Sequence, residues 1–359
     1  MKVAVLGVGL IGGSIGLAAR ARAGAHVSGY DPDGGVLERA LALGAIDSAS
    51  EDLADAVAGA DVVFAATPVG ALPATVSAAL AAAPRECVVS DVGSTKRLLA
   101  DAGADERFVG GHPLAGAESA GVEHAREDLF DGAVWYLTPS EHSTAGVLYE
   151  RLHRLLTSVG AQPVAIDAAT HDRLMASVSH LPHVLANALV LQAAATLGTD
   201  GAERLPAVGP SFRDATRVAG ANSAIWTDIY LSNRDAIIAG IDELIEHLHE
   251  VRARLAAGDA PAVDAWNECA RAARDALLGA ALVGGPVQEL RVSVPNRPGV
   301  IADIALALGR DGVNIADLAL SPSRDNSQGV VALWISGGEQ HTRRAHELIA
   351  ALGFPVARP

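Results

Sequence analysis

The sequence predicts an α/β fold with a parallel sheet, followed by an all-α domain and a small α+β module. Three features support this prediction. In residues 1–166, short β-branched apolar runs alternate with Ala-rich helical segments, which is typical of a parallel sheet covered by helices. In 167–283, strand patterns are absent and long helical patterns replace them. After a Gly-Pro linker, 284–359 has the strand and helix order βαββαβ of a ferredoxin-like module.

Length and charge narrow the classes of function. A chain of 359 residues suggests two or three domains, and a hydrophobic content of 50% provides for sizeable cores. Asp and Glu number 42 against 27 Lys and Arg, so the net charge is −15. Because nucleic acids and anionic membranes repel such a chain, we expect neither as a partner and expect small-molecule ligands instead.

The cysteines and the apolar segments bear on cellular location. Cys87 and Cys269 lie far apart and outside any Cys/His cluster, so we expect reduced thiols in a cytoplasmic protein and no metal site. An apolar run after Lys2 resembles a signal peptide, but glycines interrupt it from Gly7 to Gly16. No other stretch has the roughly eighteen continuous apolar residues of a membrane helix.

The amino-terminal glycines have the spacing of a dinucleotide site. A β-branched strand pattern precedes Gly7-x-Gly9-x-x-Gly12, and a helical pattern follows it. We expect Gly7 to form the tight turn, Gly9 to let the backbone reach a pyrophosphate, and Gly12 to let helix and strand pack closely. Leu10 and Ile11 complete the loop, where the start of the helix attracts phosphate charge.

A carboxylate and a Thr-Pro pair extend this site. Asp31 ends the second strand pattern, 19 residues after Gly12, where it would accept hydrogen bonds from the ribose hydroxyls and repel the 2′-phosphate of NADP. The sequence therefore predicts NAD as the cofactor of a Rossmann-type domain, with a coincidental Gly-rich turn as the alternative. Thr67 and Pro68 follow another strand and should face the same crevice. Ser14 could add a hydroxyl near the start of the helix.

His112 is the candidate catalytic group. Gly110 and Gly111 precede it, and Pro113 follows it. We predict a loop here, because paired glycines let the backbone bend sharply and approach a ligand, while the proline fixes the next turn. A histidine on so constrained a loop suits proton transfer near neutral pH. The alternative is a surface turn with a solvated histidine.

Polar clusters elsewhere supply further candidates. Ser94 lies in Asp-Val-Gly-Ser-Thr-Lys (91–96), directly after a strand pattern, where it could also cap a helix. Arg213 and Arg217 are one helical turn apart and suit a dicarboxylate substrate, because a guanidinium fork matches a carboxylate bidentately. Structural ion pairs with neighbouring aspartates are the alternative.

The helical pattern at 168–197 carries the sequence Ser-His-Leu-Pro-His at its centre. On an ideal helix, residues 171, 175, 179 and 183 share one face, which would place Ser179 and His183 together. Pro182 should kink or divide this helix. For His171 taken alone, we expect a solvated surface position.

Together these motifs resemble the prephenate and arogenate dehydrogenases of tyrosine biosynthesis. The resemblance covers nearly the whole chain and includes the glycine fingerprint, Asp-Val-Gly-Ser-Thr-Lys, Gly-His-Pro-Leu-Ala-Gly-Ala-Glu, Ser-His-Leu-Pro-His and Phe-Arg-Asp-Ala-Thr-Arg. It implies NAD-dependent oxidative decarboxylation of prephenate to 4-hydroxyphenylpyruvate, with arogenate as the alternative substrate. It also implies a homodimer formed by the helical domain.

The resemblance assigns roles to individual residues. His112 would take the proton of the ring hydroxyl as hydride leaves, Ser94 would hydrogen-bond His112, and Arg217 would bind a substrate carboxylate. Positions that match pocket residues with less defined roles are Ser179, His183, Glu118, Trp226 and Arg213. Segment 220–224 departs from the Ser-Asp-Pro form of some members, which leaves substrate gating open.

The carboxy-terminal module resembles an ACT domain, a regulatory amino-acid-binding module that some family members carry. Pro-Asn-Arg-Pro-Gly (295–299) and Gly-Val-Asn-Ile (312–315) are the matching segments. The resemblance implies an aromatic amino-acid effector, tyrosine first of all, near Asn296, Gly299 and Asn314. A module that only helps association is the alternative.

Two other classes of function are alternatives for the whole chain. One is another β-hydroxyacid dehydrogenase of this build, against which the Ser-His-Leu-Pro-His cluster argues. The other is a non-catalytic amino-acid sensor that keeps a nucleotide fold. The presence of a candidate base, a carboxylate clamp and a phosphate loop argues against a sensor.

Overall fold

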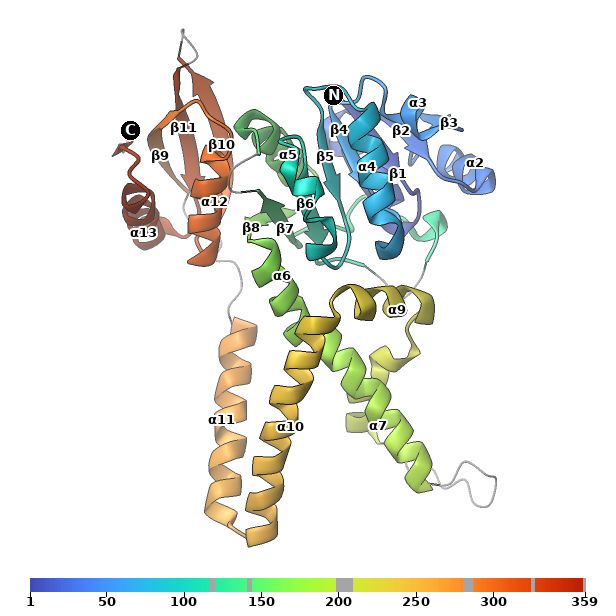
Figure 1. The fold of residues 1–359 in the computed structure, drawn as a ribbon, viewed down its shortest axis with the longest axis vertical. Coiled ribbons are helices and arrows are strands. Elements are labelled where there is room, and N and C mark those ends of the chain that lie inside the picture. The colour runs from blue at the N-terminus through green and yellow to red at the C-terminus, as the bar shows by residue number, and fades with distance from the viewer. Residues whose placement is uncertain (117–119, 141–143, 198–208, 280–286, 324–326, 358–359) are drawn as a thin grey trace. The chain divides into compact units, whose positions relative to one another are not determined.

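The computed structural model describes residues 1–116, 120–140, 144–197, 209–279, 287–323 and 327–357 (Figure 1). The chain forms two compact units. The first consists of Met1–His171 with residues 282–359, and it holds the amino-terminal sheets and the carboxy-terminal module. The second consists of residues 172–281 and is helical in its described part.

A five-stranded parallel sheet is the centre of the first unit. Its strand order is β3-β2-β1-β4-β5. The strands are β1 (Lys2–Leu6), β2 (His26–Tyr30), β3 (Ser48–Ser50), β4 (Val62–Ala65) and β5 (Val88–Asp91). The helices that follow them are α1 (Leu10–Ala23), α2 (Gly34–Ala42), α3 (Leu53–Val57) and α4 (Leu72–Ala82). Every residue of β4 and β5 is buried, as expected for strands covered on both faces, and the predicted parallel sheet is confirmed.

A smaller sheet continues from the first and holds the candidate base. Its strands are β6 (Val109–Pro113), β7 (Val134–Pro139) and β8 (Gln162–Ala165), and α5 (Gly146–Ser158) lies between the last two in sequence. β6 pairs with β7 in antiparallel register, with His112 opposite Tyr136, and β7 pairs with β8 in parallel.

The predicted loop around His112 is therefore wrong, because this histidine lies in a strand. The two glycines before it allow close packing of strands instead of a bend. A Cβ at Gly110 would overlap Thr138 Oγ1, and a Cβ at Gly111 would lie 2.5 Å from the carbonyl oxygen of Asp91. Only glycine lets β6 approach β5 and β7 this closely.

The carboxy-terminal module has the predicted βαββαβ order. Its elements are β9 (Gln288–Pro295), α12 (Val300–Arg310), β10 (Ile315–Pro322), β11 (Gln328–Ile335), α13 (Gly338–Ala351) and β12 (Val356–Ala357). The antiparallel sheet has the order β10-β11-β9-β12, so the terminal segment does add an edge strand. Buried and exposed residues alternate along β9 and β11, which means that the module covers one face of this sheet.

This module docks tightly on the amino-terminal sheets, which the sequence did not indicate. At Gly309, a Cβ would overlap the carbonyl oxygen of Ala165 in β8. At Gly146, it would lie 2.5 Å from Ile301 of α12. The backbone N–H of Gly299 donates to the Thr144 carbonyl at 2.7 Å. The carboxy-terminal module and the amino-terminal sheets therefore pack directly against each other, and we call this interface the seam.

A long helical stretch leads from the first unit into the second. It consists of α6 (Ala168–Met175), a π-helical turn (Ala176–His180) and α7 (Leu181–Leu197). Pro182 lacks an N–H, and its ring clashes with the carbonyl four residues before it in a regular α-helix. The π turn widens the backbone directly before Pro182, so the predicted disturbance of the helix is confirmed. The helical path nevertheless continues through this point and is not divided. By length and composition, the described stretch Ala168–Thr196 would be able to cross a membrane. Its first part carries polar His171 and Asp172, which are both fully buried in the fold.

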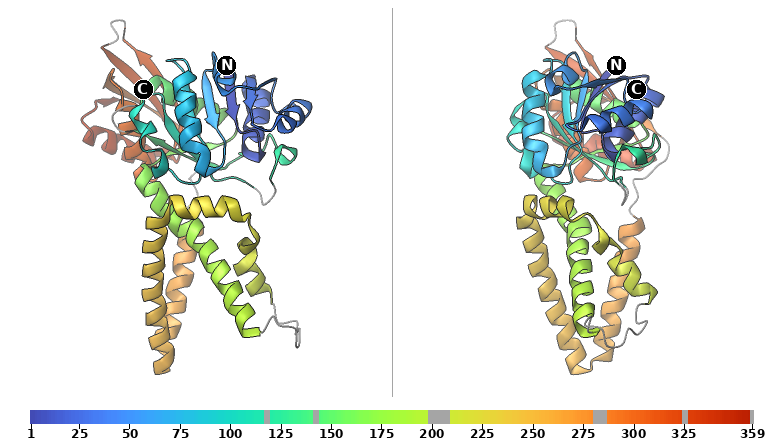
Figure 2. Two further views of the ribbon diagram at one scale, coloured as in Figure 1. Left: turned by 45° about the vertical axis from the view of Figure 1, so that its right-hand side comes forward. Right: turned by 90° about the vertical axis from the view of Figure 1, so that its right-hand side faces the viewer.

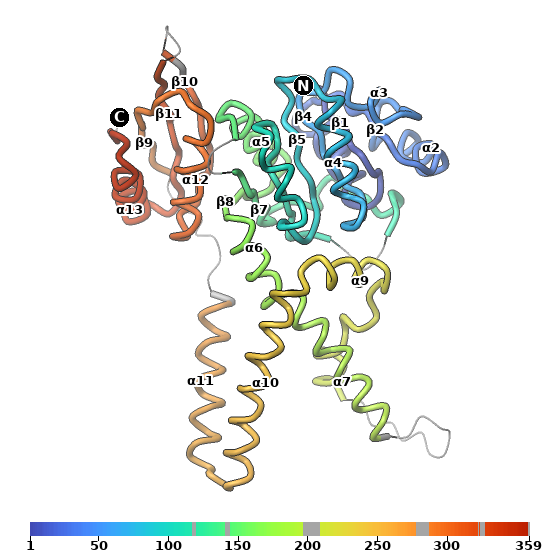
Figure 3. Tube along the Cα trace, viewed as in Figure 1, coloured from blue at the N-terminus to red at the C-terminus, as the bar shows by residue number. Residues whose placement is uncertain are grey.

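The remaining helices of the second unit are α8 (Pro210–Thr216), α9 (Ser223–Ser232), α10 (Arg234–Ala257) and α11 (Ala260–Gly279). α10 and α11 form an antiparallel hairpin (Figures 2 and 3). Gly258 turns the chain between them in the left-handed conformation, with φ of 64°. Large apolar side chains are exposed within the single chain on α7, α10 and α11, among them Leu191, Leu248, Leu255 and Trp266.

Candidate active site

The glycine loop after β1 has the geometry of a dinucleotide cradle. Gly7 has φ of +93°, and a Cβ there would lie 2.7 Å from the Ala66 carbonyl oxygen. At Gly12, a Cβ would overlap the Gly7 carbonyl oxygen. A Cβ at Gly9 would meet nothing within 4 Å, so this residue borders open space. Two of the three glycines are thus required by the fold, whereas Gly9 faces space that a ligand can use.

The start of α1 borders the same space. Leu10 is its first residue and Ile11 its second, and Gly9 at the N-cap has no side chain to bond the first backbone N–H groups. The first turn holds no acidic residue, so nothing there opposes an anion. The buried Ser14 hydroxyl donates to the carbonyl of Leu10, the first residue of α1, at 2.7 Å and accepts from the Arg126 N–H at 3.0 Å. It therefore lies near the start of the helix, and a contact with a phosphate stays a prediction.

The predicted carboxylate lies beside the glycine loop. Asp31 accepts one hydrogen bond from the Val8 N–H at 3.0 Å and another from the Asp33 N–H at 3.0 Å. The loop after β4 lies against Gly7, as the close approach of Ala66 shows. In that loop Thr67 is half-buried and hydrogen-bonds Thr75 at 3.3 Å, while Pro68 is exposed. The structure therefore brings the glycines, Asp31 and Thr67 to the carboxyl edge of the parallel sheet.

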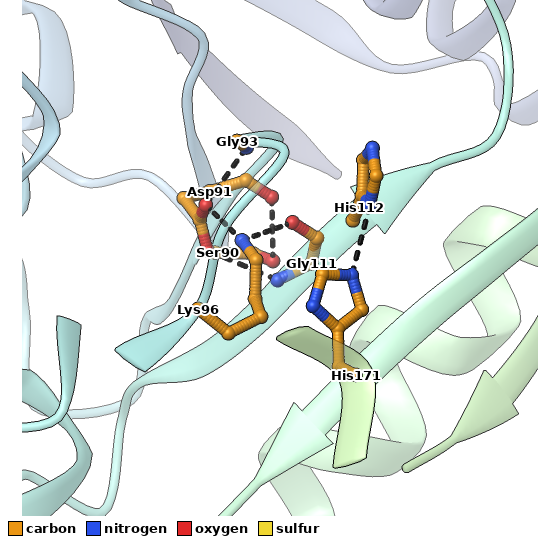
Figure 4. Close-up of polar contacts among 7 residues, drawn as sticks. All are labelled: Ser90, Asp91, Gly93, Lys96, Gly111, His112 and His171. Atoms are coloured by element: carbon orange, nitrogen blue, oxygen red, sulfur yellow. Dashed lines mark hydrogen bonds and ion pairs between the residues drawn. The ribbon is translucent and has the colours of Figure 1, made fainter. Parts of the chain in front are cut away.

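A buried ion pair connects this edge with the strand of the candidate base (Figure 4). Asp91, at the end of β5, pairs with Lys96, and both side chains are almost completely buried. Asp91 also accepts the N–H groups of Gly93 at 2.8 Å and Gly111 at 3.0 Å. Lys96 Nζ donates to the Gly111 carbonyl at 2.6 Å. Both backbone polar groups of the residue before His112 are thus fixed by charged partners.

His112 itself is bonded to a second histidine. Its Nδ1 lies 2.9 Å from Nε2 of His171 on α6, and Figure 4 shows the two rings joined on the side of Gly111 away from Asp91. The His112 side chain is buried, with 9% exposure, and His171 is 0% exposed. The ring of Tyr136 meets His171 edge-on at 5.7 Å, and burial raises the pKa of this tyrosine.

His171 is the site residue that sequence reasoning missed. We expected it on a solvated surface, and that expectation is wrong because the helix start packs into the first unit. The available signal was its place directly before Asp172, at the head of the Ser-His-Leu-Pro-His helix. Ser94 is half-buried on the loop after β5, and its hydrogen bond to His112 stays a prediction.

The second unit gathers an aromatic cluster around the Ser-His-Leu-Pro-His segment. His183 stacks on Trp226 with ring centroids 3.3 Å apart, and His180 meets Trp226 edge-on at 6.0 Å. Asn233 Nδ2 donates to the Asp172 carbonyl at 2.8 Å and to His180 Nδ1 at 3.1 Å. Ser179 is half-buried beside these residues in sequence.

The predicted arginines belong to this second unit. Arg217 follows α8 at the start of a 3₁₀ turn, and its side chain is exposed. Burial and the positive charge of Arg217 both lower the pKa of His183, which places the two groups near each other. Arg213 is exposed on α8, and Glu118 lies outside the described residues. Convergence of Arg217 with His112, which belongs to the first unit, stays a prediction.

The predicted regulatory residues do not form one cluster. Asn296 lines a cavity of about 320 Å³ in the seam between the carboxy-terminal module and the amino-terminal sheets. The Gly299 N–H donates to the Thr144 carbonyl, and the φ of +84° at this position favours glycine over other residues. Asn314 lies beyond the far end of α12 and donates to Ser336 Oγ at 3.2 Å.

Sequence comparisons identify the family. Family models match the chain in three consecutive parts: the prephenate dehydrogenase nucleotide-binding domain at 15–165, the prephenate dehydrogenase dimerization domain at 167–267, and the ACT domain at 289–346. The prephenate dehydrogenase of Bacillus subtilis is 33% identical over 98% of this chain and 96% of its own length. This chain belongs to the prephenate dehydrogenase family.

Other relatives are named as cyclohexadienyl, prephenate or arogenate dehydrogenases. The cyclohexadienyl dehydrogenase of Zymomonas mobilis is 34% identical over 72% of this chain and 89% of its own length. The crystal structure of A. aeolicus prephenate dehydrogenase with hydroxyphenyl propionate and NAD⁺ superposes with a TM-score of 0.72 at 27% identity, over 77% of this chain and 98% of that one. The crystal structure of Synechocystis arogenate dehydrogenase superposes with a TM-score of 0.66 at 26% identity, over 77% of this chain and 100% of that one.

The glycine geometry yields a prediction that separates folding from cofactor binding. Gly9→Ala should leave thermal stability unchanged, because its Cβ enters open space and its φ of −84° suits alanine. It should weaken NAD⁺ binding about 10- to 100-fold, because the added methyl enters the space that lets the backbone N–H groups reach the pyrophosphate and so costs about as much as one hydrogen bond to a charged group. Gly12→Ala should instead destabilise the fold by at least about 1–3 kcal/mol through overpacking. Thermal unfolding and NAD⁺ titration of both variants measure this, and Gly9→Ala protein with wild-type NAD⁺ affinity would contradict it.

Proposed function

We propose that this chain is an NAD-dependent prephenate dehydrogenase that forms 4-hydroxyphenylpyruvate and carbon dioxide. The observation that carries the proposal is the buried His112, tied by Gly111 to the carboxyl edge of the nucleotide sheet and bonded through Nδ1 to His171. With Nδ1 engaged, the role of base falls to Nε2. Family membership supports the same reaction.

His112 would hold one proton during the reaction. Its Nε2 accepts the proton of the ring hydroxyl as the carbon that bears it becomes a carbonyl. NAD⁺, when bound, supplies the acceptor for the hydride that leaves this carbon. The ring carboxylate then departs as carbon dioxide, its electron pair makes the ring aromatic, and His112 returns the proton to the phenolate oxygen. The products are 4-hydroxyphenylpyruvate, carbon dioxide and NADH, so atoms and charge balance.

The residues around the glycine loop fit the cofactor. We assign the pyrophosphate to Gly7, Gly9 and Gly12 with Leu10 and Ile11 at the uncapped start of α1. Asp31 already accepts two backbone hydrogen bonds, and a carboxylate has roughly four acceptor sites, so it retains capacity for ribose hydroxyls. Thr67 and Pro68 would border the same crevice.

The substrate carboxylates would be bound from the second unit. We assign one carboxylate to Arg217, because the exposed guanidinium is able to form a bidentate pair. Ser179, His183 and Trp226 would line the pocket beside it, together with Arg213 and Glu118. Because His171 engages Nδ1, Ser94 would hydrogen-bond Nε2 of His112 until the substrate hydroxyl takes its place. Arogenate is the second candidate substrate, since relatives named cyclohexadienyl and arogenate dehydrogenase share this build. The base chemistry is the same for both.

We also propose a cytoplasmic homodimer with the domain division 1–166, 167–283 and 284–359. The match to a dimerization domain supports the homodimer. So do the exposed apolar side chains of α7, α10 and α11, because large apolar surface on a helical hairpin indicates an association site.

The proposed base gives a direct test. His112→Asn should keep NAD⁺ binding and lower kcat by about 10²–10⁴, the range for loss of a general base. Steady-state turnover with prephenate and NAD⁺ titration of the same protein measure the two effects. Undiminished turnover in this variant would remove His112 from the mechanism.

An amino-acid effector would bind in the seam cavity. Arg297, which also pairs with Asp303 at 3.0 Å, offers further N–H donors to a carboxylate. Glu106 offers an anion for an ammonium group, and Val147, Ile301 and Leu320 form an apolar wall. The cavity also reaches the segment that leads into the strand of the base: Glu106, which lines it, lies three residues before β6, and the Glu106 carbonyl accepts the Ala145 N–H at 3.1 Å. We therefore propose allosteric control by an aromatic amino acid, tyrosine first, bound at this seam.

Calorimetric titration of the full chain with tyrosine and phenylalanine tests the effector site. Arg297→Met should weaken binding of the amino acid about 10- to 100-fold through loss of a charge-assisted hydrogen bond. Arg343→Met is the matched control, because this exposed arginine lies on α13 outside the cavity. The absence of heat with either amino acid, or equal affinities in the two variants, would count against the proposal.

A further inference from the structure

We infer that His171 is a positioning residue for the base. In this role it accepts the Nδ1 hydrogen of His112, holds His112 in the tautomer that leaves Nε2 as the base, and stabilises the imidazolium that forms during turnover. The inference rests on the proposed function of His112 as the base. It adds a second histidine whose contribution is separable by experiment.

The hydrogen bond admits only two arrangements, and one of them is catalytically useful. Between His112 Nδ1 and His171 Nε2, at 2.9 Å, a single hydrogen is shared by two neutral rings. If His171 donates, then neutral His112 carries its hydrogen on Nε2 and is unable to accept a proton there. If His112 donates, its Nε2 presents a lone pair. The proposed base therefore requires His171 to be the acceptor.

The surroundings hold His171 in place for this role. The Asp167 carboxylate accepts the Thr170 N–H at 2.9 Å, and the Asp167 carbonyl accepts the His171 N–H at 2.9 Å, which fixes the start of α6. Tyr136, which pairs with His112 across β6 and β7, packs edge-on against the His171 ring. The same strand pair thus sets the positions of both histidines.

Burial makes the hydrogen bond energetically important. Once His112 has taken a proton, a positive charge lies in a site from which water is largely excluded, and such a charge is costly without a partner. Lys96 and Asp91, which bind the backbone of Gly111 beside His112, form an ion pair with each other. Asp172, the residue after His171, is also buried, and its backbone carbonyl accepts from Asn233. Tyr136 on β7 is uncharged at neutral pH, since burial raises its pKa. The His171 ring on α6 is therefore the group that accepts from the new imidazolium.

Substitutions at position 171 distinguish an acceptor from a mere filler. Leucine fills a similar volume and has no acceptor, whereas the Oε1 atom of glutamine reaches about as far as histidine Nε2 and accepts a hydrogen bond. His171→Leu should lower kcat at least tenfold with little change in the KM for prephenate. It should also move the acid limb of the kcat/KM profile to lower pH, because the imidazolium loses its acceptor. His171→Gln should restore a large part of both.

The experiment is the pH dependence of steady-state turnover for wild type, His171→Leu and His171→Gln, with prephenate and NAD⁺. His26→Leu is the control, because this exposed histidine lies at the amino end of β2, at the opposite edge of the sheet from the site. It should match wild type. If His171→Leu does not fold, His171→Asn replaces it, because its shorter side chain does not reach His112 and should also lower kcat and move the acid limb.

The outcomes separate the two proposals. A wild-type protein that does not turn over prephenate or arogenate overturns the proposed function and the role of His171 with it. An active wild type whose His171→Leu or His171→Asn variant keeps kcat and the acid limb overturns the positioning role alone. A loss of kcat that glutamine does not restore, with an unmoved pH profile, also overturns it, since it indicates a packing role.

Discussion

The position of the candidate base depends on the buried ion pair of Asp91 and Lys96. Two opposite charges removed from water are costly to bury, and they are tolerated when each finds further hydrogen-bond partners. Here those partners are the two backbone polar groups of Gly111 and the N–H of Gly93. The pair therefore fastens β6 to the end of β5, at the edge of the sheet where the glycine loop also lies. Removal of either charge would leave the other buried without its partner and loosen the strand that carries His112.

Much of the fold was predictable because local patterns determine it. The strand, glycine and helix spacing around Gly7 and Gly12 reflects steric limits within one turn, and the structure shows both limits directly. The βαββαβ order of the carboxy-terminal module follows from alternating burial along short segments. Pro182 is sterically incompatible with a regular α-helix before it, and the π turn at Ala176–His180 accommodates its ring. In each case the cause lies within a few residues of its effect.

The features that sequence reasoning missed depend on contacts between distant segments. Gly110 and Gly111 suggested a bend, but they are glycines because Thr138 and the Asp91 carbonyl approach them from other strands. His171 looked like a surface residue, and its burial results from its contact with a residue 59 positions earlier. The seam beside Gly309 and Gly146 is likewise invisible in the local sequence, since both glycines are explained only by the chain that packs on them. Long-range packing thus decides which polar residues become partners.

In the proposed reaction, this protein couples hydride transfer to loss of a ring carboxylate. The most direct measurement is the stoichiometry of purified full-length protein incubated with prephenate and NAD⁺, in which NADH, carbon dioxide and 4-hydroxyphenylpyruvate are quantified in the same reaction. We predict equal amounts of all three products, and much slower reduction of NADP⁺, because Asp31 should repel its 2′-phosphate. NADH formed without carbon dioxide, or no NADH with either prephenate or arogenate, would contradict the proposed reaction.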